Sequence, residues 1–386
     1  MTFKILSLDG GGMRGVVSAT ILKQIEEILY KKKGKKLHEY FDLIAGTSTG
    51  SILAAGIACQ KDAKSLIDLY KKEGKNIFLD SVRSERKWRL LSRLFRSRGL
   101  YPNQDKEPGL AEVLQKQLIY PGLGKSPTLE DIQHPSLLIL AYDVLSRNTT
   151  WFANDGKYEK NGKEKWYYTL PLWKICTASA SAPTFFPSVP LWHNELEEYL
   201  PHIDGGVAAN NPTLAAIAHA LSMRMADGTI SKLNLQDIAA LSIGTGSTTP
   251  PYKYPEIRNW GLLDWVKNLP NIFLNPGAEN SERIAECILQ KADIQNYLRL
   301  DFRLNYRFDI EENKLVKLKQ RYNGYIFKET NEKKEISEDI DDPNTCNDLI
   351  LATKCYINHG EVQWNVNGNN SNITVIEAIE KFIELH

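Results

Sequence analysis

Two short glycine-flanked motifs, far apart in the chain, restrict the fold that this sequence can adopt. The first spans residues 46–50 and reads Gly-Thr-Ser-Thr-Gly, directly after an apolar run. A Gly-x-Ser-x-Gly pattern is typical of a sharp strand-to-helix turn that exposes the serine, here Ser48, as a nucleophile. The second spans residues 204–206 and reads Asp-Gly-Gly, again after an apolar run. We therefore expect an α/β fold that brings Asp204 beside Ser48, and a hydrolase that needs no histidine.

A third motif, at residues 9–15, reads Asp-Gly-Gly-Gly-Met-Arg-Gly. Glycine N–H groups at the start of a helix can point at one oxygen, which suits a developing oxyanion. The same letters also contain Gly-x-Gly-x-x-Gly, the fingerprint of dinucleotide-binding oxidoreductases. Three features weigh against that alternative. Asp9 would repel a phosphate, Arg14 has no place in the fingerprint, and the next strand has no acid at its end to hold a ribose.

Length and composition set broad limits on the class of protein. The 386 residues allow one large domain or two ordinary ones. A formal net charge of +1 gives no global field that would favour a nucleic-acid polymer. The five cysteines are scattered, with no pair at metal-ligand spacing, which is typical of a reducing compartment. We find no signal sequence and no apolar run long enough to span a membrane, so we expect a cytoplasmic protein.

Hydrophobic periodicity predicts alternating strands and helices. Apolar runs predict strands at residues 3–8, 41–45, 137–143 and 239–243, and helices are predicted at residues 16–30, 50–59, 214–221, 348–357 and 375–385. This alternation favours a mostly parallel sheet with helices on both faces. Leu8, Ala45 and Ile243 each precede a glycine turn, so these turns should gather at one edge of the sheet, where active sites of such folds lie.

A serine hydroxyl needs an adjacent base to act as a nucleophile. Seven histidines are present, but none lies in a glycine-flanked loop after a late strand, where a triad histidine is expected. His202 comes nearest to a motif, two residues before Asp204, and would point to the same side of a strand as Asp204. We keep His202 as an alternative base, although a structural role fits it better.

The joint set of motifs resembles the patatin-like phospholipase family. Further segments agree with it, at residues 177–183, 185–187 and 241–246, and Asp341-Asp342 before the next helix resembles the closing segment of the family. The resemblance covers roughly residues 3–357, so we expect one catalytic domain at residues 1–357 and a short C-terminal extension at residues 358–386. It implies a three-layer α/β fold and lipid acyl hydrolysis, of phospholipase A type, without a metal or other cofactor.

Carried over position by position, the resemblance implies a Ser–Asp dyad with Ser48 as nucleophile and Asp204 as base. It also implies an oxyanion hole formed by backbone N–H groups among Gly10, Gly11 and Gly12, with Arg14 nearby as support. The expected substrate is a phospholipid or galactolipid at a membrane surface, which would place the protein at the periphery of the inner membrane. Bacterial relatives include phospholipases activated by a cyclic dinucleotide in anti-phage defence, so we also consider such an activator.

Two segments are candidates for lipid contact. Residues 83–98 hold seven basic residues and one acid, with tryptophan, leucine and phenylalanine on the other side of a predicted helix. This pattern suits an interfacial helix, a helix packed on the protein body, or a nucleotide phosphate site. Residues 260–273 hold two tryptophans, three leucines, one isoleucine and one phenylalanine, and suit a lid, a wall of an acyl-chain site, or core packing. A non-catalytic patatin-like storage or binding protein remains an alternative to the enzyme.

Overall fold

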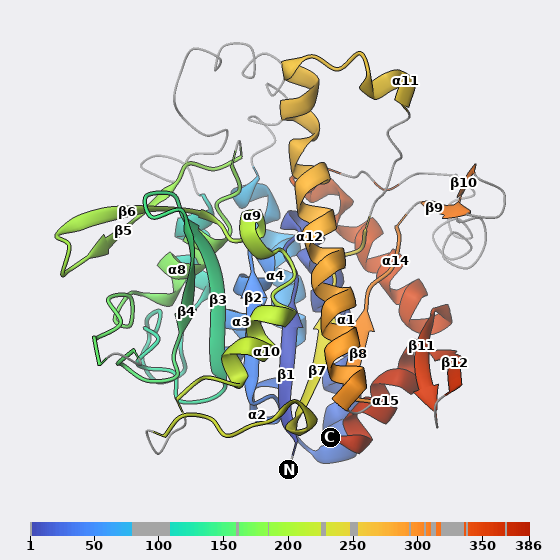
Figure 1. Ribbon diagram of the computed structural model, residues 1–386, viewed down its shortest axis with the longest axis horizontal. Coiled ribbons are helices and arrows are strands. Elements are labelled where there is room, and N and C mark those ends of the chain that lie inside the picture. Colours follow the sequence, from blue (N-terminus) through green and yellow to red (C-terminus); the bar gives the residue numbers. More distant parts are fainter. Residues whose placement is uncertain are drawn as a thin grey trace.

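The computed structural model describes most of the chain (Figure 1). The described residues are 2–78, 109–159, 162–183, 185–224, 229–247, 254–292, 295–304, 306–309, 314–317, 336, 339–366 and 369–386. The segment at residues 83–98, for which the sequence left three roles open, lies outside the described residues.

An eight-stranded sheet forms the centre of the protein, in the order β5-β6-β3-β2-β1-β7-β8, with β4 paired to β3. The strands are β1 (Phe3–Leu8), β2 (Leu43–Thr47), β3 (Ser136–Asp143), β4 (Asn148–Ala153), β5 (Val189–His193), β6 (Glu198–Asp204), β7 (Ile238–Ile243) and β8 (Tyr297–Leu300). The run from β3 to β8 is parallel, whereas β4, β5 and β6 add antiparallel pairs beside β3. The predicted mostly parallel sheet is therefore confirmed, and its antiparallel edge is a feature that the sequence did not reveal.

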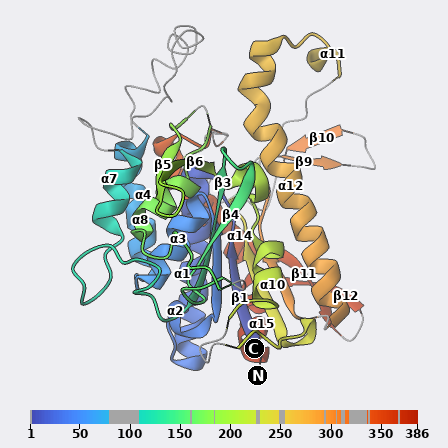
Figure 2. The same ribbon diagram turned by 60° about the vertical axis from the view of Figure 1, so that its left-hand side comes forward.

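Helices cover both faces of this sheet, as predicted (Figure 2). On one face lie α1 (Gly15–Lys33), α3 (Thr49–Ala58), α4 (Ala63–Ile77), α7 (Leu110–Gln117), α8 (Leu172–Ser179), α14 (Cys346–His359) and α15 (Val375–Leu385). The other face carries α10 (Thr213–Ala220) and α12 (Leu262–Ala292). The remaining described α-helices are short: α2 (Leu37–Tyr40), α9 (Gly206–Ala209) and α11 (Tyr254–Ile257). Three short 3-10 helices are also described, at Gly12–Arg14, Leu235–Asp237 and Pro343–Thr345. Two hairpins, β9 (Tyr306–Asp309) with β10 (Lys314–Lys317) and β11 (Glu361–Val366) with β12 (Asn369–Thr374), lie outside the sheet.

The apolar composition of the parallel strands explains this layering. Successive side chains of a strand point to opposite faces, so a strand covered on both sides is apolar at nearly every position. Leu6 and Ile139 belong to the larger core cluster under α1 and α3, whereas Ile5 and Leu138 belong to the smaller cluster under α10. The continuous apolar runs seen in the sequence are therefore strands buried from both sides.

The C-terminal helix α15 belongs to the same packed body as the N-terminal half. Its apolar stripe is buried and consists of Val375, Ala378, Ile379, Phe382 and Ile383. These residues join the larger core cluster, and α15 contacts both α1 and α14. Both chain termini lie together at the amino end of the central strands (Figure 1). The segment proposed as an extension thus covers part of the core.

We expect Phe382→Ala to lower the free energy of unfolding of the whole protein by about 3–5 kcal/mol, because it removes a fully buried ring and leaves a cavity. Leu385→Ala, on the same helix but half exposed, is the matched control and should change it by less than about 0.5 kcal/mol. Urea unfolding followed by circular dichroism measures both. Equal, small effects of the two variants would show that α15 does not contribute to the core.

Candidate active site

Ser48 lies at the turn between β2 and α3, as the sequence predicted for a nucleophile. Its backbone has φ 54° and ψ −124°, a conformation that non-glycine residues rarely adopt. Its N–H donates a hydrogen bond to Ser179 Oγ at 3.0 Å, and its carbonyl accepts one from Ser51 N–H at 2.9 Å. These bonds hold the strained turn, which presents the side chain at the N-terminus of α3, where the helix dipole favours negative charge.

The turn also requires a glycine at position 50. A Cβ added to Gly50 would lie 2.0 Å from the carbonyl oxygen of Leu8, far closer than any real contact. The first turn of α3 therefore packs directly on the carboxyl end of β1, which is possible only without a side chain. This approach brings the turn that carries Ser48 next to the glycine cluster that follows β1.

Asp204 lies at the end of β6 and contacts Ser48 directly. Ser48 Oγ donates a hydrogen bond to Asp204 Oδ2 at 2.6 Å, and the other carboxylate oxygen accepts one from Gly206 N–H at 2.7 Å. Both side chains are buried, with Ser48 8% and Asp204 5% exposed. The structure thus brings together the two residues that the sequence paired, hydroxyl to carboxylate.

Burial raises the pKa of Asp204 to about 6, although the hydrogen bonds from Ser48 and Gly206 favour the charged form and oppose this effect. A carboxylate with a raised pKa is a stronger base than one in water, yet it stays largely ionised at neutral pH. Asp204 can therefore accept a proton from Ser48 without an intervening imidazole.

His202, the alternative base, is committed to other contacts. Its ring is fully buried, with Nε2 2.9 Å from Thr150 Oγ1 and Nδ1 3.0 Å from the Leu200 carbonyl oxygen. It packs against the rings of Phe152 and Trp166. Burial lowers its pKa, so its neutral form is favoured. In this structure His202 is a structural residue.

The segment at residues 179–181 connects both members of the pair, and sequence reasoning assigned it no role. Ser179 Oγ accepts the hydrogen bond from Ser48 N–H and donates one to the Leu140 carbonyl at 2.6 Å. The Ser181 carbonyl accepts a hydrogen bond from Asp204 N–H at 2.9 Å, and the Ser179 carbonyl accepts one from Gly205 N–H at 3.1 Å. One short segment thus fixes the backbone on both sides. In the sequence this segment is a run of small residues within the stretch 177–183 that agrees with the family, and neither signal indicates these hydrogen bonds.

The glycine cluster after β1 borders a cavity beside Ser48. One of the N–H groups expected as an oxyanion donor is already hydrogen-bonded within the protein. Gly10 N–H donates to the Asn210 carbonyl at 3.0 Å, so of the three expected donors this one is already paired in the structure. Gly11 and Gly12 line the cavity beside Ser48. Arg14 supports the loop through its backbone, since its N–H donates to the Gly11 carbonyl at 3.1 Å.

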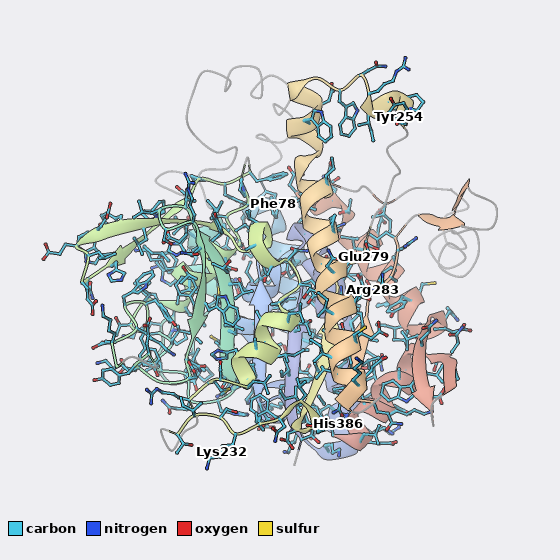
Figure 3. The ribbon with its side chains drawn as sticks, viewed as in Figure 1. Phe78, Lys232, Tyr254, Glu279, Arg283 and His386 are labelled. Carbon is cyan, nitrogen blue, oxygen red and sulfur yellow. The ribbon has the colours of Figure 1, made fainter. Side chains whose placement is uncertain are left out.

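An apolar cavity of about 580 Å³ opens beside Ser48 and Asp204. Its walls include Ile52 from α3, Ile77 and Phe78 from the end of α4, and the pair Phe185–Phe186. Phe78 and Phe186 contact each other with ring centroids 5.7 Å apart. Figure 3 places Phe78 towards the upper end of the body, opposite His386 and the termini. The cavity suits a long apolar group attached to an ester.

The segment at residues 260–273 contributes little to this cavity where its side chains are described. Trp260 and Trp265 contact each other edge to face, with ring centroids 5.1 Å apart, and Trp265 is 41% exposed. Neither of them, nor Ile272, lines the cavity, so the expectation of an acyl-chain wall is not met by these three side chains. From Leu262 onward, the backbone of this segment forms the first part of α12. Among the described helices, none is both long and apolar enough to cross a bilayer.

The fold and the site are those of the serine hydrolase class, with an apolar cavity beside the Ser48 hydroxyl. Comparison with known proteins supplies the family. A family model described as patatin-like phospholipase matches residues 6–217, more than half of the chain, and the protein belongs to this family of serine lipid acyl hydrolases.

Individual relatives are moderately similar to this chain. Patatin-like protein 3 of Arabidopsis thaliana is 30% identical over 342 residues, covering 77% of this chain and 73% of that protein. Probable inactive patatin-3-Kuras 1 of Solanum tuberosum is 28% identical over 318 residues, covering 77% of each chain. A cGAMP-activated phospholipase of Vibrio cholerae is 31% identical over 250 residues, covering 63% of this chain and 64% of that protein.

The raised pKa of Asp204 makes protein stability depend on pH. The folded state binds the proton of the Asp204 carboxyl group more tightly than the unfolded state, in which the pKa of this group is near 3.8. The protein therefore loses stability as the pH rises from the unfolded-state pKa of 3.8 to the folded-state pKa of about 6. Asp204→Asn cannot titrate and avoids that loss. We expect its free energy of unfolding, relative to the wild type, to increase by about 2 kcal/mol between pH 4 and pH 8.

Chemical denaturation at several pH values measures this difference. The control is Ser48→Ala, which keeps the buried carboxyl group and removes a hydrogen bond that favours its charged form, so its stability should depend on pH at least as strongly as that of the wild type. A constant difference between Asp204→Asn and the wild type across this range would contradict the raised pKa.

Proposed function

We propose that the protein hydrolyses fatty-acyl esters of membrane glycerolipids, phospholipids or galactolipids, as a phospholipase of A type. The observation that carries the proposal is the 2.6 Å hydrogen bond from Ser48 Oγ to Asp204 Oδ2 beside an apolar cavity. In the proposed mechanism Ser48 is the nucleophile, Asp204 is the general base, and the N–H groups of Gly11 and Gly12 bind the oxyanion.

Acylation begins when Ser48 Oγ attacks the ester carbonyl carbon and its proton passes to Asp204 Oδ2. The carbonyl oxygen becomes an oxyanion, and the glycine N–H groups stabilise it more strongly than they stabilise the neutral carbonyl. The intermediate collapses, the bond to the alcohol oxygen breaks, and Asp204 returns the proton to the leaving lysolipid. The fatty acid is then esterified to Ser48.

Deacylation repeats these steps with water. Asp204 takes a proton from a water molecule as the water attacks the acyl carbon, and the second intermediate collapses to a free fatty acid. Ser48 Oγ recovers the proton from Asp204, which restores the starting state. The acyl chain occupies the cavity bordered by Phe78, Phe185 and Phe186 throughout, since its apolar walls favour transfer of a hydrocarbon chain from water.

The proposed place of action is the inner surface of the cytoplasmic membrane, with the protein bound peripherally. All five cysteines are free thiols, and four of them are buried. Such a set is typical of a reducing compartment. The substrate enters from the lipid layer, and the cavity receives its acyl chain.

We expect Ser48→Ala to abolish hydrolysis of a short-chain p-nitrophenyl ester and of phospholipid vesicles, and Asp204→Asn to lower kcat by about 10⁴-fold, because the first removes the nucleophile and the second its base. A fluorophosphonate probe should label the wild type, fail to label Ser48→Ala, and label Asp204→Asn slowly. Ser371→Ala, an exposed serine in β12, is the control and should behave as the wild type. Undiminished hydrolysis by Ser48→Ala would refute the mechanism.

Regulation by a cyclic dinucleotide is a further part of the proposal. It is supported by the similarity to the cGAMP-activated phospholipase of Vibrio cholerae. Positive coupling between an activator and a catalytic site typically changes the response by about 5- to 150-fold. We expect cGAMP to raise the rate of phospholipid hydrolysis by at least about 10-fold, with the mononucleotides GMP and AMP as controls. An unchanged rate at millimolar cGAMP, with the basal activity present, would exclude this activator while leaving the hydrolase intact.

A further inference from the structure

The peptide that joins Gly10 to Gly11 is held from both sides by residues far away in the chain. The Gly10 carbonyl accepts hydrogen bonds from Thr245 Oγ1 at 3.1 Å and from Asn210 Nδ2 at 3.3 Å. Gly10 N–H donates to the Asn210 carbonyl. Thr245 is 6% exposed and follows β7, while Asn210 follows α9. This part of the glycine cluster is therefore fixed by its surroundings and not by its own local geometry.

These bonds determine where the next N–H group points. In a trans peptide the C=O and N–H groups lie in one plane and point in opposite directions. When Thr245 and Asn210 hold the Gly10 carbonyl, the Gly11 N–H must point away from them. In the described part of the chain, no acceptor is found for the N–H groups of Gly11 and Gly12, and both residues line the cavity beside Ser48.

Thr245 also contacts Gly11 directly. A Cβ added to Gly11 would lie 2.3 Å from Thr245 Oγ1 and 2.7 Å from its Cβ, so the absence of a side chain at Gly11 allows this approach. This close approach puts the Thr245 hydroxyl within hydrogen-bond distance of the Gly10 carbonyl. The second peptide is held independently, because Arg14 N–H binds the Gly11 carbonyl and thereby orients Gly12 N–H.

We infer that Thr245 is a positioning residue for the oxyanion hole, whose hydroxyl holds the Gly10–Gly11 peptide so that Gly11 N–H remains directed at the reacting oxygen. This inference rests on the proposed hydrolytic function and adds a residue to it. Thr245 touches no substrate, since it is not among the residues that line the cavity. Its contribution is made to the transition state, because only there does the oxygen carry the charge that Gly11 N–H stabilises.

The test compares Thr245→Val, which keeps the shape and removes the hydroxyl, with Thr245→Ser, which keeps the hydroxyl. Removal of an oxyanion donor costs about 10²- to 10³-fold in kcat, so misalignment of one donor should lower kcat of Thr245→Val by about 10- to 100-fold. KM for the short-chain ester should change by less than about threefold, because the ground state makes little use of the hole. Thr245→Ser should keep kcat within about threefold of the wild type. The rate of fluorophosphonate labelling should follow kcat.

Thermal unfolding of each variant establishes that it is folded. If Thr245→Val does not fold, Thr245→Ala replaces it, because this variant also lacks the hydroxyl but puts no methyl group in its place. Equal kcat and labelling rates for Thr245→Val or Thr245→Ala and Thr245→Ser would overturn the positioning role, with the hydrolase unaffected. Loss of activity through KM alone would overturn it as well. A wild type that neither hydrolyses esters nor reacts with the probe would overturn the proposed function, and this inference with it.

Discussion

The contact between Ser48 and Asp204 depends on one topological constraint, the position of β3 between β2 and β6. Thr47 of β2 pairs with Leu140, and Asp204 of β6 pairs with the next residue, Ala141. The two residues come from strands on either side of β3, and Gly205, which follows β6, lets the chain pass close to β3 at Leu140. A Cβ at Gly205 would lie 2.2 Å from the Leu140 carbonyl oxygen. β6 therefore ends level with the carboxyl end of β2, which places Asp204 beside the turn that carries Ser48.

Much of this arrangement could be predicted from the sequence, because its signals are local. The turn at Ser48 has a five-residue pattern, and the buried parallel strands are continuous apolar runs. The antiparallel edge could not be predicted with the same ease, since β4 and β5 are partly exposed and lack such runs. The pairing of the Gly10 N–H group could not be predicted for a related reason. Whether its N–H is free depends on Asn210, 200 residues away, and no local pattern reports that pairing.

The residues that support the site were missed for the same reason. Ser179 and Thr245 act through hydrogen bonds to backbone groups that are distant in sequence, and a serine or threonine in a small-residue run looks like any other. Together they show that the strained turn and the glycine cluster depend on hydrogen bonds from residues outside these two segments. Ser179 holds the backbone at Ser48, and Thr245 and Asn210 hold the peptide after Gly10. Hydrogen bonds from distant residues therefore stabilise conformations that the local sequence alone would not maintain.

The location of the two chain ends has a practical consequence. β1 starts, and α15 ends, at the amino ends of the parallel strands, whereas Ser48 follows the carboxyl end of β2 (Figures 1 and 3). A fusion partner, affinity tag or surface tether attached at either end would therefore hang from the base of the molecule. An immobilised protein would present its cavity outward, towards vesicles supplied in solution, and an added domain at either end would leave the route to the reactive hydroxyl unobstructed.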